Sequence, residues 1–222
     1  MCNLYSDLTA PDWIKIHTDF AESDWHIPAG NKQPLPAIFP DGVASVVRKT
    51  HKGRELVKMR WGFPVPEPKP GEKKKPGYQT NIRQPNWAHW RPWMEREFRC
   101  LVPVTSFCEY QDGSKLPTWF ALDDARSPFF FAGVWMPWTG KRGTKANPAE
   151  GDHLLYSFLT TKPNKEVAPV HAKAMPVILR DEAAWKTWLM GSVDEALALQ
   201  CPLPDGTLKI VAKGERKDGL AA

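Results

Sequence analysis

Short runs rich in Val, Ile, Phe, Trp and Tyr, separated by turn residues, recur along most of this 222-residue chain. Such runs are typical of strands, because β-branched and aromatic side chains suit a pleated, half-buried surface. Two of them, Ala44–Thr50 and Arg54–Arg60, are joined by His51-Lys52-Gly53 and predict a β-hairpin. The other predicted strands are Arg99–Pro103, Ser106–Tyr110, Thr118–Leu122, Pro128–Trp135, Leu154–Thr160, Pro176–Leu179 and Leu208–Val211.

Helical patterns are fewer than strand patterns. The predicted helices are Asp7–Phe20, Pro85–Arg96, Asp181–Met190 and Val193–Gln200. Many short strands with few helices between them favour antiparallel sheets over a parallel α/β arrangement. We therefore expect an α+β fold in which mainly antiparallel sheets form an open barrel-like core with peripheral helices.

The length fits one domain, since single domains reach about 250 residues before they split. A hydrophobic fraction of 42%, with 11 Trp and 10 Phe, can build a substantial core. We expect residues 1–222 to form a single domain, with Gly214–Ala222 as a polar, frayed tail.

Several classes of protein are disfavoured by composition. No stretch approaches 18 apolar residues, and the N-terminus lacks a basic region followed by an apolar run, so neither a membrane span nor a secretory signal is expected. The four cysteines are widely spaced and form no C-x-x-C pattern. This argues against a zinc site and a disulfide scaffold, and suits a reducing cytoplasm.

The net charge of +5 is modest, but part of it is local. Lysines cluster in Pro64–Gly77, which we expect to be a mobile basic flap, and Trp87, Trp90 and Trp93 follow it. Basic and aromatic side chains together are typical of proteins that hold single-stranded nucleic acid. The same tryptophans, three residues apart, also suit one buried face of a helix, which Pro92 would kink. Core packing is the favoured interpretation of the three rings.

Cys2 stands directly behind the initiator Met1. Removal of Met1 would leave an α-amine and a thiol on adjacent carbons, with reference pKa values of about 7.7–8.0 and about 8.5. The amine can condense with an aldehyde, and the thiol can close the imine into a thiazolidine ring. The thiol can alternatively act as a nucleophile with its own amine as base.

Five segments occur in a recognisable order along the chain. They are Met1–Tyr5, Met59–Gly62, Thr80–Arg83, Cys100–Pro103 with Phe107–Tyr110, and His171–Val177. Together they resemble the SOS-response-associated peptidase (SRAP) family, from residue 2 to about residue 213. Members of this family sense abasic sites in single-stranded DNA.

The resemblance implies a specific chemistry. Family members expose Cys2 by losing Met1, in some cases by self-cleavage, and trap the ring-opened sugar of an abasic site as a thiazolidine crosslink. Their active-site asparagine, glutamate and histidine fall on Asn81, Glu109 and His171. The predicted catalytic set is therefore Cys2, Asn81, Glu109 and His171, acting in an abasic-site crosslinking enzyme with peptidase and lyase-type activity.

The resemblance also suggests residues that bind DNA. The family's arginine falls on Arg83, its threonine on Thr160, and Lys173 lies within the last matching segment. A guanidinium can hold a backbone phosphate bidentately without reading sequence, and Trp61 is a candidate stacking surface for a base. At Asn3-Leu4, where members often have glycine and arginine, no phosphate contact is implied.

The residue types suit these roles. Glu109 lies on a predicted strand beside Phe107 and Tyr110, so we expect the pKa of its carboxyl group to be raised. The group could then act as both acid and base. His171 can polarise the sugar oxygen or move a second proton, while Asn81 can orient the aldehyde or the amine. Taken alone, Glu109 is more typical of a solvated strand face than of a catalytic site, and His171 suits a structural loop.

Three hypotheses follow for function. The favoured one is a crosslinker of abasic sites whose partner is single-stranded DNA. The second is an N-terminal-nucleophile cysteine peptidase or amidohydrolase acting on another substrate, and the third is a noncatalytic nucleic-acid-binding module. For the favoured hypothesis we expect a cytoplasmic monomer, nucleoid-associated on damaged DNA, with no metal, cofactor or membrane.

Overall fold

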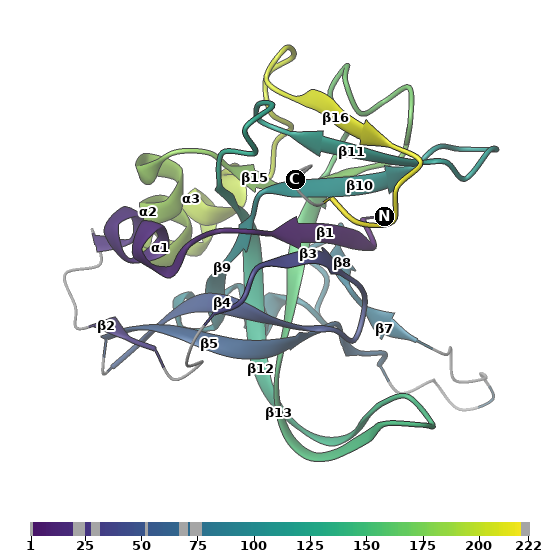
Figure 1. Ribbon diagram of the computed structural model, residues 1–222. Helices are drawn as coiled ribbons and strands as arrows, with labels where there is room; N and C mark the ends of the chain where they lie inside the picture. Colours follow the sequence, from purple (N-terminus) through teal and green to yellow (C-terminus); the bar gives the residue numbers. More distant parts are fainter. Residues whose placement is uncertain are drawn as a thin grey trace.

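Strands dominate the computed structural model, which describes residues 2–19, 25–27, 32–51, 53–66, 71 and 77–218. One sheet has five strands in the order β16-β11-β10-β1-β3, drawn in the upper part of Figure 1. Its members are β1 (Leu4–Asp7), β3 (Leu35–Ile38), β10 (Ser106–Tyr110), β11 (Pro117–Ala121) and β16 (Lys209–Lys213).

The second sheet has nine strands and closes on itself. Its main path runs β14-β13-β12-β9-β4-β5-β2, and a parallel pairing of β5 with β13 joins Trp61 to Tyr156. Strands β13, β12, β9, β4 and β5 therefore form a closed ring. The members are β2 (Trp25–His26), β4 (Val43–Thr50), β5 (Gly53–Trp61), β8 (Asn81–Ile82), β9 (Arg99–Val104), β12 (Phe129–Gly143), β13 (Pro148–Thr161), β14 (Met175–Pro176) and β15 (Ile178–Leu179).

The α+β prediction with a barrel-like core is confirmed, with the barrel closed rather than open. The predicted hairpin Ala44–Thr50/Arg54–Arg60 is the antiparallel pair β4–β5. A small two-stranded sheet, β6 (Phe63–Pro64) with β7 (Tyr78–Gln79), forms the base of the lysine-rich segment. Most of that segment lies outside the described residues.

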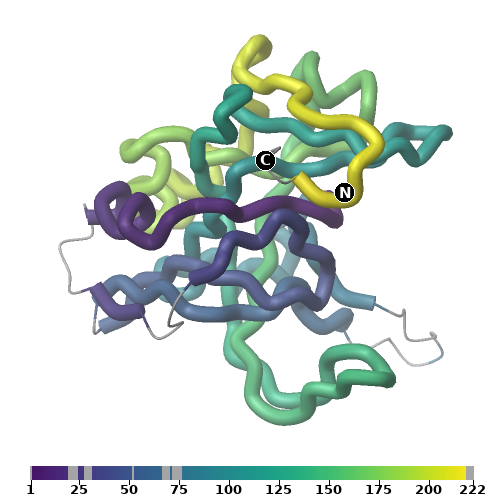
Figure 2. The backbone as a smooth tube through the Cα atoms, in the orientation of Figure 1, coloured from purple at the N-terminus to yellow at the C-terminus, as the bar shows by residue number. Residues whose placement is uncertain are grey.

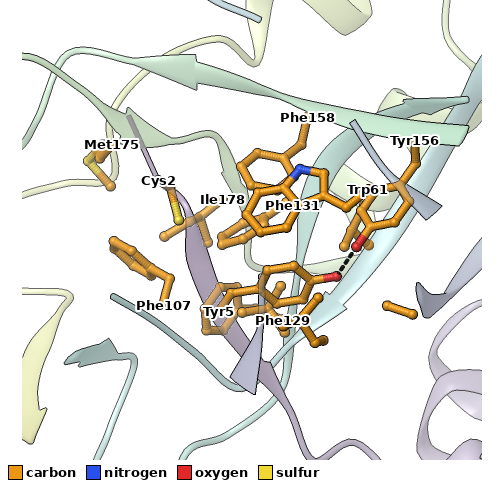
Figure 3. Packing of buried hydrophobic residues seen from close by; sticks show 14 of the residues in the cluster. Cys2, Tyr5, Trp61, Phe107, Phe129, Phe131, Tyr156, Phe158, Met175 and Ile178 are labelled. Carbon is orange, nitrogen blue, oxygen red and sulfur yellow. Dashed lines mark hydrogen bonds between the residues drawn. The ribbon is translucent and has the colours of Figure 1, made fainter. Parts of the chain in front are cut away.

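Two hydrophobic cores lie on opposite faces of the large sheet. Along β12, Phe129 and Phe131 belong to a core shared with the five-stranded sheet, while Phe130 and Ala132 pack on the helical side. Successive residues of a strand point to opposite faces, so a strand covered on both sides needs a continuous apolar run. Figure 3 shows the first core, in which Tyr5 from β1 meets aromatic rings from the large sheet.

The helices lie at the periphery: α1 (Pro11–His17), α2 (Glu182–Met190) and α3 (Val193–Ala198). The side chain of Asp181 caps α2 by accepting from the backbone N–H of Ala184, and Ser192 forms a capping box with Glu195 at α3. No helix in the described part of the chain is long and apolar enough to cross a membrane.

Two predicted helices need correction. The first begins at Pro11 rather than Asp7, because residues 4–7 form β1 between β3 and β10. Pro85–Arg96 contains turns instead of an α-helix, followed by two 3-10 helices, η2 (Arg91–Met94) and η3 (Arg96–Phe98). Pro92 lacks the N–H that an α-helix would need and its ring clashes with the preceding turn.

The ends of the chain and of β12 also differ from expectation. Residues 214–218 are packed rather than frayed, since Trp119 donates to the carbonyl of Glu215 and Asp218 is ion-paired with Arg126. Residues 219–222 lie outside the described part. Strands β12 and β13 continue well past the predicted Trp135 and form the long arm at the bottom of Figure 2, ending at the pair Gly143–Pro148.

Candidate active site

The N-terminal segment is held inside the five-stranded sheet. Strand β1 pairs antiparallel with β10, with Leu4 opposite Cys108, so Cys2, two residues before β1, lies beside the strand that contains Glu109. The Cys2 thiol lies 3.5 Å from the carbonyl oxygen of Leu4 and 3.9 Å from that of Cys108. Figure 3 shows Cys2 in the core cluster with Phe107 and Met175.

Cys2 is fully buried in the chain that still carries Met1. Burial raises the pKa of its thiol well above the usual value, and Glu109 raises it further, while the charge of the amino terminus acts in the opposite direction. Because the thiolate is the nucleophilic form of cysteine, this thiol is held in its unreactive S–H form.

Asn81 fixes the backbone of Cys2. Its Nδ2 donates to the Cys2 carbonyl oxygen and to Thr80 Oγ1, both at 2.8 Å. Asn81 itself is positioned by β8, which runs parallel to β13 beside Phe158. The Oδ1 atom of Asn81 is buried and accepts no hydrogen bond within the described residues. One hydrogen-bond acceptor beside Cys2 therefore has no partner among the described residues.

Glu109 and His171 form the titratable part of the site. Glu109 Oε2 lies 3.8 Å from His171 Nδ1, and that nitrogen donates to the Ala174 carbonyl oxygen at 2.9 Å. Burial raises the pKa of Glu109 to about 8, against a lowering by the amino-terminal charge. Its Oε1 is buried without a hydrogen-bond partner in the described structure. Near neutral pH this carboxyl group can therefore both donate and accept a proton.

The four predicted catalytic residues are thus in one place. Asn81 is hydrogen-bonded to the carbonyl oxygen of Cys2, and Glu109 interacts electrostatically with the Cys2 thiol. His171 lies next to Glu109. Within the described residues, no group of three or more His, Cys, Asp or Glu side chains gathers as a metal site. The arrangement offers an acid–base pair beside a buried thiol.

Asn81 also lines a groove of about 300 Å³. Its lining residues are Tyr78, Gln79, Thr80, Asn81, Arg83, Gln84, Trp87 and Trp90. Arg83, predicted to bind phosphate, is exposed and lines this groove. Lys173 is also exposed, two residues after His171. Their contacts with DNA stay predictions.

Two of the residues predicted to bind DNA, Trp61 and Thr160, are buried in this structure. Trp61 is fully buried, and its indole N–H donates to the carbonyl of Thr80 at 3.0 Å. Thr160 is 1% exposed, and its hydroxyl donates to the carbonyl of Ile82 at 3.5 Å. Neither side chain presents a surface to DNA. Both instead hold the segment that carries Asn81 against the large sheet.

The three tryptophans of the Pro85–Arg96 segment divide between the two interpretations. Trp90 is 5% exposed and packs against Phe63, and Trp93 is partly buried in the same core, as predicted. Trp87 is 63% exposed and lines the groove. Sequence reasoning did not select Trp87 or Tyr78 as functional. Pro92 was the sequence signal that could have indicated an exposed Trp87. A proline inside this segment breaks the helical spacing that would bury all three rings.

Comparison with known proteins places this geometry among related folds. The family model described as SOS response associated peptidase (SRAP) matches residues 1–212. A protein from Bordetella bronchiseptica superposes with a TM-score of 0.68 at 21% identity, covering 94% of this chain and 97% of that one. A protein from Bacteroides thetaiotaomicron gives 0.65 at 18%, covering 94% and 90%. A phage-related protein from Bordetella bronchiseptica gives 0.61 at 20%, covering 94% and 92%. No curated protein matches significantly.

Proposed function

The chain belongs to the SOS response associated peptidase family, and on that premise we propose that it is an abasic-site sensor that crosslinks to DNA through Cys2. Removal of Met1, by this protein or by an aminopeptidase, would free the α-amine. The reaction partner is the ring-opened sugar aldehyde of an abasic site in single-stranded DNA, and the product is a thiazolidine.

The reaction needs proton transfer and no oxidant. The amine adds to the aldehyde carbon and one water leaves, giving an imine. The thiol then adds to the imine carbon, and its proton moves to the nitrogen. Opening the closed sugar and expelling water each require a proton donor and an acceptor.

The observation that carries the proposal is the raised pKa of Glu109, about 8, beside Cys2. A carboxyl group with this pKa is mainly protonated at neutral pH, so it can supply a proton and then receive one. His171, 3.8 Å away, is a second titratable group for the relay. Asn81 holds the Cys2 carbonyl oxygen, which fixes the direction of the attacking amine.

DNA would approach along the groove that Asn81 lines. Arg83 on its wall supplies a charge for a backbone phosphate, a contact that sets position without selecting sequence. The groove also exposes aromatic surface, which suits unpaired bases.

The test is covalent capture. The purified protein, its intact mass showing loss of Met1, is incubated with uracil-containing single-stranded DNA that uracil glycosylase has converted to abasic DNA. We expect a product that resists denaturation in the wild type and none in Cys2→Ala. Cys201→Ser is the matched control, because Cys201 is an exposed free cysteine. Loss of product in Cys201→Ser, or a protein that crosslinks with Met1 in place, would refute the proposal.

A peptidase acting on another substrate is the second candidate, because the matching family is named for that activity. Cys2, Glu109 and His171 would then serve acyl transfer. Turnover of an amide substrate without any denaturation-resistant DNA product would favour it.

A further inference from the structure

Asn3 separates Cys2 from strand β1, and it is exposed. The ladder between β1 and β10 begins at Leu4, opposite Cys108. Residues 2 and 3 therefore lie beyond the paired part of the strand, and the end of a chain keeps a fixed position only where other contacts hold it. Loss of Met1 would make these two residues the end of the chain.

A series of hydrogen bonds connects Asn3 to Asn81. The Thr80 hydroxyl donates to Asn3 Oδ1 at 3.4 Å, and Asn81 Nδ2 donates to the same hydroxyl oxygen at 2.8 Å. Asn81 Nδ2 also donates to the carbonyl oxygen of Cys2 at 2.8 Å. Cys2 and Asn3 are thus held by one hydrogen-bond network.

Thr80, at the centre of this network, is itself fixed. It is 6% exposed, and its carbonyl oxygen accepts from the indole N–H of the buried Trp61 at 3.0 Å. Trp61 is the last residue of β5. The side chain of Asn3 is therefore hydrogen-bonded to a residue that the large sheet holds in place.

The Thr80 hydroxyl also determines the orientation of the Asn81 amide. A hydroxyl group carries one hydrogen and two lone pairs. Because the hydrogen is directed to Asn3 Oδ1, the hydroxyl oxygen can only accept from Asn81, and it accepts from Nδ2. In this orientation Nδ2 also reaches the Cys2 carbonyl oxygen. Without the Asn3 side chain, the hydroxyl hydrogen could turn and bond the Oδ1 atom of a flipped amide.

We propose that Asn3 is a positioning residue for Cys2, because it fixes the Asn81 amide through Thr80 and thereby the backbone of the reacting residue. The inference rests on the proposed function only for the reaction whose rate it affects. A glycine at residue 3, which members of the family often have, offers no side chain for this bond. The network is thus specific to chains with a side-chain acceptor at this position.

The test measures two rates in Asn3→Ala, with protein whose intact mass shows loss of Met1. The first is single-turnover crosslinking at saturating abasic single-stranded DNA. It should fall about 3–10-fold, the factor expected for one lost hydrogen bond. The DNA concentration that gives half of the maximal rate should stay unchanged, because the network acts on Cys2 and not on DNA.

The second rate is alkylation of the Cys2 thiol by iodoacetamide, followed by peptide mass spectrometry. It should rise about 3–10-fold, because a loosened chain end exposes a thiol that is otherwise fully buried. Cys100 is the internal reference, since it is fully buried in the same core. Its alkylation should stay at the wild-type rate.

Variants of Thr80 test the network. Thr80→Val removes the hydroxyl and should change both rates in the same directions as Asn3→Ala. Adding Asn3→Ala to it should have no further effect, because the two residues act as one unit. Thr80→Ser keeps the hydroxyl and should restore both wild-type rates. Asn147→Ala is the matched control, since Asn147 is an exposed asparagine that lines a different groove.

Two results would overturn the inference. Wild-type values for both Cys2 rates in Asn3→Ala would mean that Asn3 does not position Cys2. Faster alkylation of Cys100 together with Cys2 would mean that the substitution loosens the whole core and that Asn3 has only a general structural role.

The two rates separate this inference from the proposed function. If the wild type forms no DNA product but Asn3→Ala and Thr80→Val expose Cys2 to iodoacetamide, the positioning role stands and the crosslinking proposal fails. If the wild type crosslinks and both variants match it in both rates, the crosslinking proposal stands and the positioning role fails.

Discussion

Two buried carboxyl groups at strand β10 have opposite environments. Asp218 contacts the start of the strand, and Glu109 belongs to the strand itself. At its start, Ser106 donates to Asp218, which also accepts two hydrogen bonds from Arg126. Near its end, Glu109 has one oxygen 3.8 Å from His171 and the other without a partner in the described structure. Asp218 is 2% exposed and Glu109 is 1% exposed, so burial does not explain the difference.

The contrast distinguishes a carboxylate used for stability from one available for chemistry. A buried charge is tolerated when an opposite charge and hydrogen bonds satisfy it, as at Asp218. A buried carboxyl group without such partners holds its proton instead, as the raised pKa of Glu109 indicates. An unpaired buried polar atom costs about 1–3 kcal/mol, a cost that active sites commonly carry.

We expect the largest effect from Glu109→Gln, which tests whether Glu109 is the carboxyl group used for chemistry. The quantity that should change is the rate of crosslinking. Glutamine keeps the size of the side chain but cannot transfer the proton, so single-turnover crosslinking should slow by about 10²–10⁴-fold. The rate is measured by quenched-flow or manual sampling on denaturing gels. Asp218→Asn is the control and should react at the wild-type rate. Equal rates for wild type and Glu109→Gln would show that Glu109 is not the proton donor.

The second-largest expected effect concerns the free energy of unfolding, and here Asp218 is the residue that matters rather than Glu109. Asp218→Ala leaves the Arg126 guanidinium without its partner and should lower the free energy of unfolding by about 3 kcal/mol. Urea denaturation followed by tryptophan fluorescence measures this change. Wild-type stability in Asp218→Ala would mean that the packed C-terminal segment does not stabilise the fold.

The pH dependence of stability should differ between wild type and Glu109→Gln. The pKa of Glu109 is about 8 in the folded chain against a usual 4.5, so the folded state binds more protons between these values. Stability attributable to Glu109 is then fully present below pH 4.5 and is lost as pH rises toward 8, at up to about 1.4 kcal/mol per pH unit. Urea midpoints at several pH values give the difference between the two proteins. A difference that stays constant from pH 5 to 8 would contradict the raised pKa.

The smallest effect is expected at the groove, outside both carboxyl sites. Arg83→Ala should weaken binding to single strands of different sequence about equally and reduce the salt dependence by about one phosphate contact. Fluorescence anisotropy at several salt concentrations measures both quantities. Arg180→Ala, another exposed arginine that does not line the groove, is the control. A loss confined to particular bases would argue against a phosphate contact.

Much of the strand content could be predicted, because alternating and continuous apolar runs are local signals. The exceptions are instructive. The local pattern places Asp7 at the start of a helix and assigns residues 4–6 to no element, yet residues 4–7 form the strand that follows Cys2 and pairs with the strand carrying Glu109. That strand is stabilised by its pairing with β10, about a hundred residues away, which no local pattern encodes.

The site shows the same division. The order of motifs selected Cys2, Asn81, Glu109 and His171, and the structure brings them together. It could not separate buried from exposed side chains, so Trp61 and Thr160 were assigned to DNA while Trp87 was left to the core. Burial depends on which strands and turns pack over a residue, and that information is not local.

The sequence by itself determined the adjacent amine and thiol that Cys2 would present, because these follow from covalent structure. It also determined the succession of strands, because side-chain shape and spacing set local backbone preference. Only the tertiary structure decided that Glu109 has a raised pKa and that one tryptophan remains in solvent. Both depend on desolvation, which arises when segments distant in the chain exclude water from a side chain.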